Sequence, residues 1–125
     1  VVTPHPLEAA RLLGNSAKDV QANRVDAARA LAQKFSCVAV LKGSGTVIAA
    51  PDRPVHINPT GNARLATAGT GDVLAGLIAA RLAAGADAFE AASGAVFDHV
   101  LAADQWAGRL PLTASALARS LAPSP

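Results

Sequence analysis

Apolar residues recur along this chain with two different spacings, and these spacings predict an alternation of helices and strands. After an extended start, an apolar face with helical spacing predicts a helix over residues 7–13, which Gly14 would end. A second amphipathic stretch predicts one helical region over residues 16–35. The continuous apolar run at residues 37–41 is typical of a strand buried on both faces of a parallel sheet.

The middle of the chain alternates short apolar runs with turn residues. Residues 46–50 and 55–58 predict two short strands that form a hairpin or meander with the sheet, after a turn at residues 42–45. Residues 59–71 then predict a loop that is rich in Gly, Thr and Asn. Loops of this length in compact domains are more often functional than not, so we expect this one to belong to a site.

Helices return in the last part of the chain. Residues 72–84 predict an amphipathic helix, and residues 87–106 predict an Ala-rich helix that is nearly apolar all round and therefore buried. Thr113 can cap a last helix that runs to Leu121, and residues 123–125 predict a frayed tail. This order of elements predicts an α/β fold, a layered sheet flanked by helices, without a second domain.

The composition argues against several classes of protein. With 51% hydrophobic and 16% charged residues, the chain is globular rather than disordered. A net charge of +2, without a basic stripe or an aromatic platform, argues against nucleic-acid binding. Cys37 alone forms no internal disulfide and indicates a reducing compartment. No apolar run is long enough to span a membrane, so we expect a cytoplasmic protein without membrane contact.

Small and polar residues crowd the start of the helix predicted at residues 72–84. At Gly69-Thr70-Gly71-Asp72, glycines let backbone N–H groups approach an anion, and the helix N-terminus adds a positive partial charge. A helix start needs one capping residue, whereas five surround this one: Asn58, Thr60, Asn62, Thr67 and Thr70. We therefore favour an anion site over a simple helix start, with Asp72 placed for proton transfer or for holding a hydroxyl.

Two further motifs place polar groups at the ends of predicted strands. Lys42 ends the buried run before Gly43-Ser44-Gly45-Thr46, where it could reach a phosphate, although a solvated turn lysine fits equally well. His5, held between two prolines, would point into the ligand crevice of an open sheet, although alone a turn histidine is the simpler interpretation. His99 is expected to be a packed helix residue, and the histidine spacing predicts no metal site.

The motifs occur in one order along nearly the whole chain: Thr3-Pro4-His5-Pro6-Leu7-Glu8, Lys42-Gly43-Ser44-Gly45-Thr46, Gly61-Asn62, Gly69-Thr70-Gly71-Asp72 and Ala95-Val96-Phe97-Asp98-His99. Together they resemble the carbohydrate-kinase-like family of ADP-dependent NAD(P)H-hydrate dehydratases, which repair nicotinamide nucleotides and belong to the ribokinase-like superfamily. The Gly-Asp motif is shared across the superfamily, and the His motif is more specific. The resemblance implies that residues 1–125 are the C-terminal half of a ribokinase-like domain.

The resemblance also implies a chemistry. Such an enzyme eliminates water from hydrated NADH or NADPH and consumes ADP, because phosphorylating the hydroxyl makes it a better leaving group. His5 and Asp72 match residues that contact the hydrated dinucleotide, and Asp72 is the candidate catalytic base. Mg²⁺ would bridge the phosphates. The adenine nucleotide would bind at Lys42, Gly43, Ser44, Gly45, Thr46, Gly69, Thr70 and Gly71.

Two alternatives remain open at this point. A vitamin-precursor kinase of the same superfamily would share the Gly-Asp motif, and His5 between its prolines favours the dehydratase. An inactive nucleotide-binding fragment is the other alternative, because the chain has no Met, begins in a strand and lacks the N-terminal half of the family's domain. We also expect a homo-oligomer, and an epimerase domain upstream in the parent chain is compatible with the resemblance.

Overall fold

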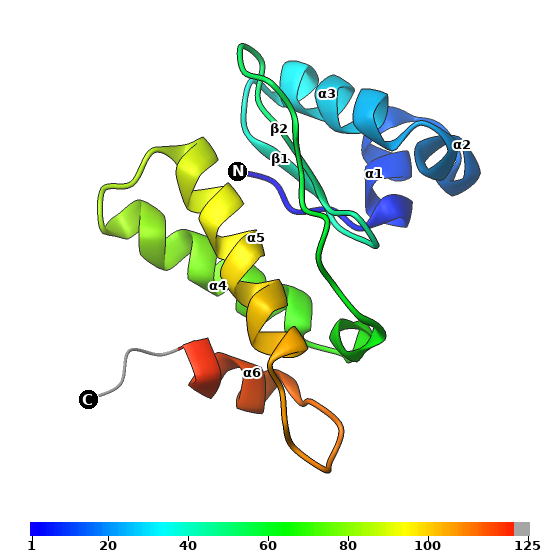
Figure 1. Cartoon of the computed structure of the whole chain (residues 1–125). Coiled ribbons are helices and arrows are strands. Elements are labelled where there is room, and N and C mark those ends of the chain that lie inside the picture. Colours follow the sequence, from blue (N-terminus) through cyan, green and yellow to red (C-terminus); the bar gives the residue numbers. More distant parts are fainter. Residues whose placement is uncertain (122–125) are drawn as a thin grey trace.

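A small sheet lies between two groups of helices in the computed structural model (Figure 1). The structure describes residues 1–121, so the tail predicted at residues 123–125 lies outside the described residues. The sheet consists of β1 (Ala39–Leu41), β2 (Val47–Ala49) and β3 (His56–Ile57), which pair antiparallel in that order. Val2 adds a parallel bridge to Ala39, so within residues 1–121 the predicted parallel character is confined to this edge.

The predicted double burial of the first apolar run is confirmed. Ala39 and Leu41 pack into the core beneath one group of helices, and Val38 and Val40 pack into the core on the other face. Alternate residues of a strand point to opposite faces, so a strand covered on both sides must be apolar at every position. The predicted meander is also confirmed, with Ile48 of β2 opposite both Val40 and His56.

Helix α3 (Arg24–Phe35) covers the first face of the sheet, and α1 (Pro6–Leu13) and α2 (Ala17–Ala22) pack against α3. The single helical region expected over residues 16–35 is wrong, because the chain leaves helical geometry at Asn23, with φ −136° and ψ 56°. The break starts α3 in a new direction, in which its buried side chains face β1 and β2. Gly14 ends α1 in the left-handed conformation, as expected.

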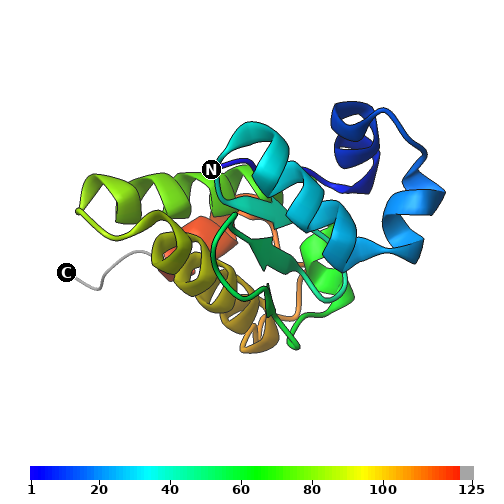
Figure 2. The same cartoon turned by 90° about the horizontal axis from the view of Figure 1, so that it is seen from above.

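The second face is covered by α4 (Thr70–Ala83) and α5 (Ala88–Asp104), which pack against each other. Seen from above, the sheet lies between α3 and α5 (Figure 2). The short 3₁₀ helix η1 (Ala63–Ala66) interrupts the predicted loop, and α6 (Ala114–Leu121) packs on α4 and α5. Thr113 caps α6 as predicted, because its Oγ1 accepts the N–H of Ala116 at 3.2 Å. No helix within residues 1–121 is long and apolar enough to cross a membrane.

Alanine makes the close packing of these layers possible. The core under α1–α3 is built on Leu31 and Leu41 with seven buried alanines, and the core under α4 and α5 is built on Ile48, Leu74 and Phe89. Burying one such large side chain stabilises the fold by about 1.5–3 kcal/mol. The two cores hold the carboxyl end of β1 and the start of α4 in fixed positions on the same side of the sheet, where the candidate site lies.

Candidate functional site

A cavity of 570 Å³ opens where the β1–β2 turn and η1 meet the start of α4 and the middle of α5. Four residues of the segment predicted to bind a nucleotide line it, since Lys42, Gly43, Ser44 and Thr46 are present and only Gly45 is not. Thr70 and Gly71 of the Gly-Asp motif also line it, whereas Gly69 does not. The fold thus brings together two motifs that lie far apart in the sequence.

Apolar side chains make up much of the remaining wall. Leu65 of η1, Leu74 of α4 and two valines of α5, Val96 and Val100, face the same space. Binding sites for small molecules usually combine such apolar lining with a few polar groups that fix orientation. The cavity therefore suits a ligand with one flat or apolar part and one strongly polar part.

The start of α4 has an open N-terminus. Gly69 precedes the helix in the left-handed conformation, with φ 87°, and no side chain caps the first turn. A Cβ at Gly69 would lie 3.0 Å from the Cβ of Ala114, so both backbone conformation and space require glycine here. The first N–H groups of a helix have no acceptor inside it, and together with the helix dipole they form a positive end that attracts anions.

Lys42 lies directly against this open turn. A Cβ built on Gly71 would come within 2.9 Å of the Lys42 Nζ, so the absence of a side chain at Gly71 lets the ammonium approach the helix. None of the ion pairs among residues 1–121 includes Lys42. An ammonium and a helix N-terminus are two positive groups, and an anion between them would be stabilised by both.

Arg24 holds the turn that carries Lys42, and sequence reasoning missed it. Its Nη2 donates to three backbone carbonyls, at 3.2 Å to Leu41, 3.4 Å to Lys42 and 3.2 Å to Gly45. Partial burial lowers the pKa of the guanidinium. A Cβ at Gly43 would lie 3.0 Å from Nη1, so the turn is wrapped closely around Arg24. The sequence offered no signal beyond a polar residue on an amphipathic helix.

His99 is a second residue of the site that the sequence did not assign. It is 5% exposed, as expected for a packed helix residue, but it also lines the cavity, and its Nε2 lies 2.8 Å from the carbonyl oxygen of Thr70. Burial lowers the pKa of His99, and the nearby charge of Lys42 lowers it further. The hydrogen bond to Thr70 raises the pKa, but the net shift is downward. Burial therefore favours the neutral ring, and the Thr70 carbonyl, which can only accept, places its proton on Nε2.

Asp72 and His5 lie outside the cavity lining. Asp72 is an exposed residue in the first turn of α4, next to Gly71, and takes part in none of the ion pairs among residues 1–121. His5 caps α1, because its Nδ1 accepts the N–H of Glu8 at 3.2 Å. The N–H of Lys42 donates to the Pro4 carbonyl at 2.9 Å, so His5 and Lys42 follow the ends of neighbouring extended segments.

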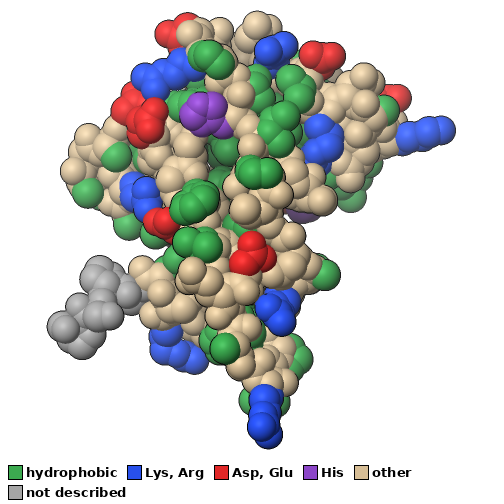
Figure 3. All heavy atoms as spheres, viewed as in Figure 1, with side chains coloured by type: hydrophobic (Ala, Val, Ile, Leu, Met, Phe, Trp, Pro, Cys, Tyr) green, Lys and Arg blue, Asp and Glu red, His purple; other side chains and the backbone are tan. Residues whose placement is uncertain are grey.

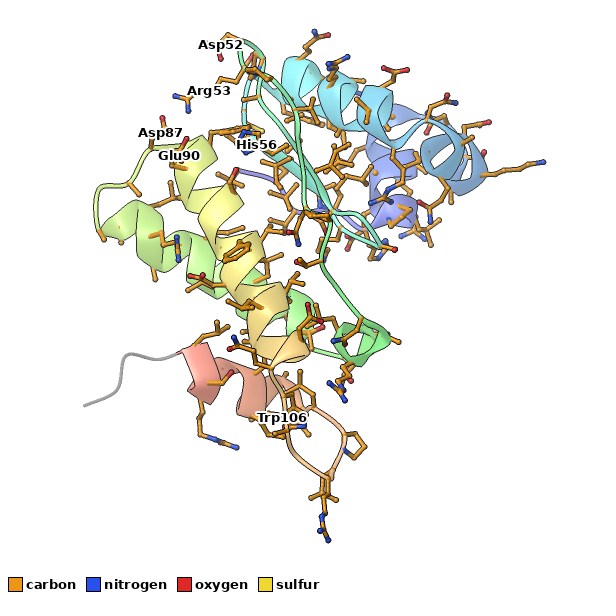
Figure 4. The ribbon with its side chains drawn as sticks, in the orientation of Figure 1. Asp52, Arg53, His56, Asp87, Glu90 and Trp106 are labelled. Carbon is orange, nitrogen blue, oxygen red and sulfur yellow. The ribbon has the colours of Figure 1, made fainter. Side chains whose placement is uncertain are left out.

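The opposite end of the sheet has a different character. On the face in Figure 3, hydrophobic side chains gather near a histidine, and acidic and basic side chains are interspersed. A groove of 300 Å³ lies there beside β3. Figure 4 shows Arg53 directed toward Asp87 at the start of α5, and its two nitrogens lie 2.9 and 3.2 Å from the carboxylate oxygens. His56 packs edge-on to Phe89, so this cluster joins the β2–β3 turn to α5.

Comparison with known proteins identifies the family of the chain. The sequence profile of the NAD(P)H-hydrate dehydratase family matches residues 1–122. The chain belongs to this family. The ADP-dependent (S)-NAD(P)H-hydrate dehydratase of Neisseria meningitidis is 46% identical over 124 residues, which make up 99% of this chain and 42% of that protein. The chain therefore spans less than half the length of this dehydratase relative.

Solved structures confirm the expected fold. The ADP/ATP-dependent NAD(P)H-hydrate dehydratase from Bacillus subtilis, co-crystallised with ATP/Mg²⁺, has a TM-score of 0.84 and 37% identity, over 97% of this chain and 45% of that one. A ribokinase-like superfamily protein from Enterococcus faecalis has a TM-score of 0.79 and 30% identity, over 97% of this chain and 42% of that one. The ribokinase-like α/β prediction for this dehydratase-family chain is confirmed, and its placement in the C-terminal half of the domain stays a prediction.

Proposed function

We propose that this chain supplies the nucleotide-binding part of an enzyme that dehydrates (S)-NAD(P)H-hydrate to NAD(P)H at the expense of ADP. The observation that carries the proposal is the Lys42 ammonium against the uncapped first turn of α4, at the wall of the 570 Å³ cavity. Membership of the dehydratase family supports this reaction over phosphorylation of a vitamin precursor.

ADP suits both parts of the cavity. Its phosphates would accept hydrogen bonds from Lys42 and from the first-turn N–H groups at Gly71, as anions do at helix N-termini. Its base would contact the apolar side chains of Leu65, Leu74 and Val96. Residues 1–121 contain no group of three acidic, histidine or cysteine side chains that could hold a metal ion. We therefore propose that Mg²⁺ enters on the phosphates, which is its usual mode of binding at phosphoryl-transfer sites.

Asp72 is proposed as the base. Its carboxylate would take the proton of the hydrate's hydroxyl while the oxygen attacks the terminal phosphorus of ADP and AMP leaves. The phosphate then departs with that oxygen, and loss of a proton from the neighbouring ring carbon restores the double bond. The N–H groups at the start of α4 would stabilise the charge on the transferring phosphoryl group. His5 would contact the dinucleotide from the neighbouring segment.

The experiment uses a hybrid in which this chain replaces the matching segment of the Neisseria meningitidis relative. Purified hybrid is incubated with hydrated NADH and ADP, and the return of NADH absorbance is followed. We expect NADH to form only when ADP is present. Phosphate transfer to another alcohol without NADH formation, in a folded hybrid that binds ADP, would contradict the dehydratase proposal.

The remaining expectations keep the status of proposals. A homo-oligomer, an upstream epimerase domain in the parent chain and a cytoplasmic location all fit the proposed repair of soluble nicotinamide nucleotides. Size-exclusion chromatography with light scattering on the hybrid tests the first of them, with a mass above that of one chain as the expected result.

A further inference from the structure

His99 is a buried titratable group to which the proposed reaction gives no role. It lies in the middle of α5, on the wall of the cavity, and it contacts α4 at the residue that begins the helix. A carbonyl oxygen can only accept, so the 2.8 Å contact with Thr70 requires a proton on Nε2. The ring therefore holds one helix against another at the edge of the proposed phosphate site.

The other ring nitrogen, Nδ1, has no hydrogen-bond partner among residues 1–121. The hydrogen bond found for this ring among residues 1–121 uses Nε2, and no buried side-chain nitrogen or oxygen of these residues lacks a partner. The Nδ1 atom of His99 is therefore not fully buried, and it belongs to a residue that lines the cavity. With the proton on Nε2, Nδ1 is a hydrogen-bond acceptor.

Thr70 is held from two sides. Its Oγ1 lies 2.7 Å from the carbonyl oxygen of Leu65 and 2.8 Å from that of Thr67, which ties it to η1, while His99 ties its carbonyl to α5. Gly71 and Asp72 follow directly, so the direction of their N–H groups depends on how Thr70 is fixed. The charged group that faces the imidazole is Lys42, on the β1–β2 turn.

We propose that His99 is a positioning residue of the nucleotide site, whose Nε2–H fixes the first turn of α4 through Thr70 and whose Nδ1 accepts a hydrogen bond from the cavity. The identity of the ligand rests on the proposed function, whereas the tautomer and the clamp on Thr70 do not. A purely structural histidine would fill space between the helices equally well in either tautomer, so the two roles make different predictions.

The tautomer is tested on this 125-residue chain itself by nitrogen NMR of the imidazole at pH 7. We expect the signal of His99 Nε2 to be that of a protonated nitrogen and the signal of Nδ1 that of a bare one. A proton on Nδ1 in place of Nε2, or on both nitrogens, would overturn the proposal without touching the proposed function.

Two variants test the clamp. His99→Gln places an amide donor within reach of Thr70, whereas His99→Phe fills the same volume without a donor. We expect the Thr70 carbonyl and the Gly71 and Asp72 amide signals to stay near their wild-type positions in the first variant and to shift in the second. Val100→Ala, on the same helix and the same cavity, is the control that perturbs packing alone. Equal shifts in all three variants would show that His99 only packs.

Ligand binding gives the third readout. In calorimetric titrations of the hybrid with ADP, we expect His99→Phe to weaken binding about tenfold and His99→Gln to weaken it no more than about threefold, within the range of one hydrogen bond. Wild-type affinity in a folded His99→Phe variant would overturn this inference. A wild-type hybrid that binds no ADP would instead overturn the proposed function, and the NMR experiments would still decide the role of His99.

Discussion

Two neighbouring helices each have an aspartate near their N-terminus, and the two aspartates differ in their contacts. At the start of α5, Asp87 accepts the N–H groups of Phe89 and Glu90 and also binds Arg53. At the start of α4, a glycine stands at the capping position, Asp72 is the third residue of the helix, and no side chain accepts the first N–H groups. One helix end is closed by its own sequence, and the other is left open beside a lysine.

The difference separates an aspartate used for stability from one available for chemistry. The N–H of Glu90 lowers the pKa of Asp87 most, and Phe89 and Arg53 lower it further, so this carboxylate is committed to the fold. Asp72 is exposed and belongs to none of the ion pairs among residues 1–121. The open helix end lacks the stability that a cap would provide, and the proposed anion site gives this open end a function.

The largest expected effect is the loss of enzymatic turnover when Asp72 is replaced. In the hybrid, Asp72→Asn should lower the rate of NADH formation by about 10²–10⁴-fold, the usual contribution of a general base, because the amide cannot take the hydroxyl proton. ADP affinity and the melting temperature should stay near wild type. If the variant keeps its rate, Asp72 is a helix-end residue like Asp87, and the comparison fails.

The next largest effect is expected for Arg24, which binds the β1–β2 turn, and it concerns stability and ADP binding. Arg24→Met leaves the Leu41, Lys42 and Gly45 carbonyls without their donor and should lower the free energy of unfolding by about 1–3 kcal/mol, with weaker ADP binding. Arg29→Met on the same helix is the control, since Arg29 is exposed and should change stability by less than about 0.5 kcal/mol. Urea unfolding measures both, and equal values for the two variants would remove Arg24 from the site.

The residues of the candidate site also show what the sequence could and could not predict. The motifs at residues 42–46 and 69–72 were visible because glycines and polar residues cluster at element ends, and the fold joins them at one cavity. The break at Asn23 was not visible, because the sequence there contains no proline or glycine. It places Arg24 under the turn, and this tertiary contact outweighs local helix propensity.

His99 illustrates the same limit. A histidine within an Ala-rich helix is most often a packed residue, and burial agrees with that expectation. Its contact with Thr70 joins residues 29 positions apart in the sequence. The spacing of apolar residues predicts helices and strands, but it does not predict a contact between two such distant residues. The residues of the two glycine-containing motifs could be found in the sequence. Arg24 and His99, which bind the backbone of another element, could not.

Two glycines of α4, Gly71 and Gly76, allow a further test of the open helix end. Gly71→Ala should weaken ADP binding about tenfold, equivalent to about 1.4 kcal/mol, because its Cβ would come within 2.9 Å of the Lys42 Nζ and displace it. Gly76→Ala is the matched control in the same helix, since nothing lies within 4 Å of its Cβ. This control should raise stability by roughly 0.5–1 kcal/mol and leave affinity unchanged. Equal affinities in titrations of the two variants would place the ligand elsewhere.

The smallest effect concerns the pH dependence of stability at the closed helix end. Because the pKa of Asp87 is lowered by folding, its contribution is present above the ordinary aspartate value of about 3.9 and is lost as the pH falls through the lowered pKa. The melting temperature of Asp87→Ala should therefore lie below wild type at pH 7, and the gap should close in strong acid. A gap that is unchanged at low pH would mean that the ionised carboxylate is not what closes this helix.

The most direct test of the open helix end is ADP titration of the hybrid with Lys42→Met, alongside its melting temperature. If Lys42 is held beside the first turn of α4 to bind an anion, the variant should bind ADP at least about tenfold more weakly while its melting temperature stays the same or rises, because one of two facing positive groups is gone. Undiminished ADP binding, in a variant whose melting temperature falls, would contradict the account.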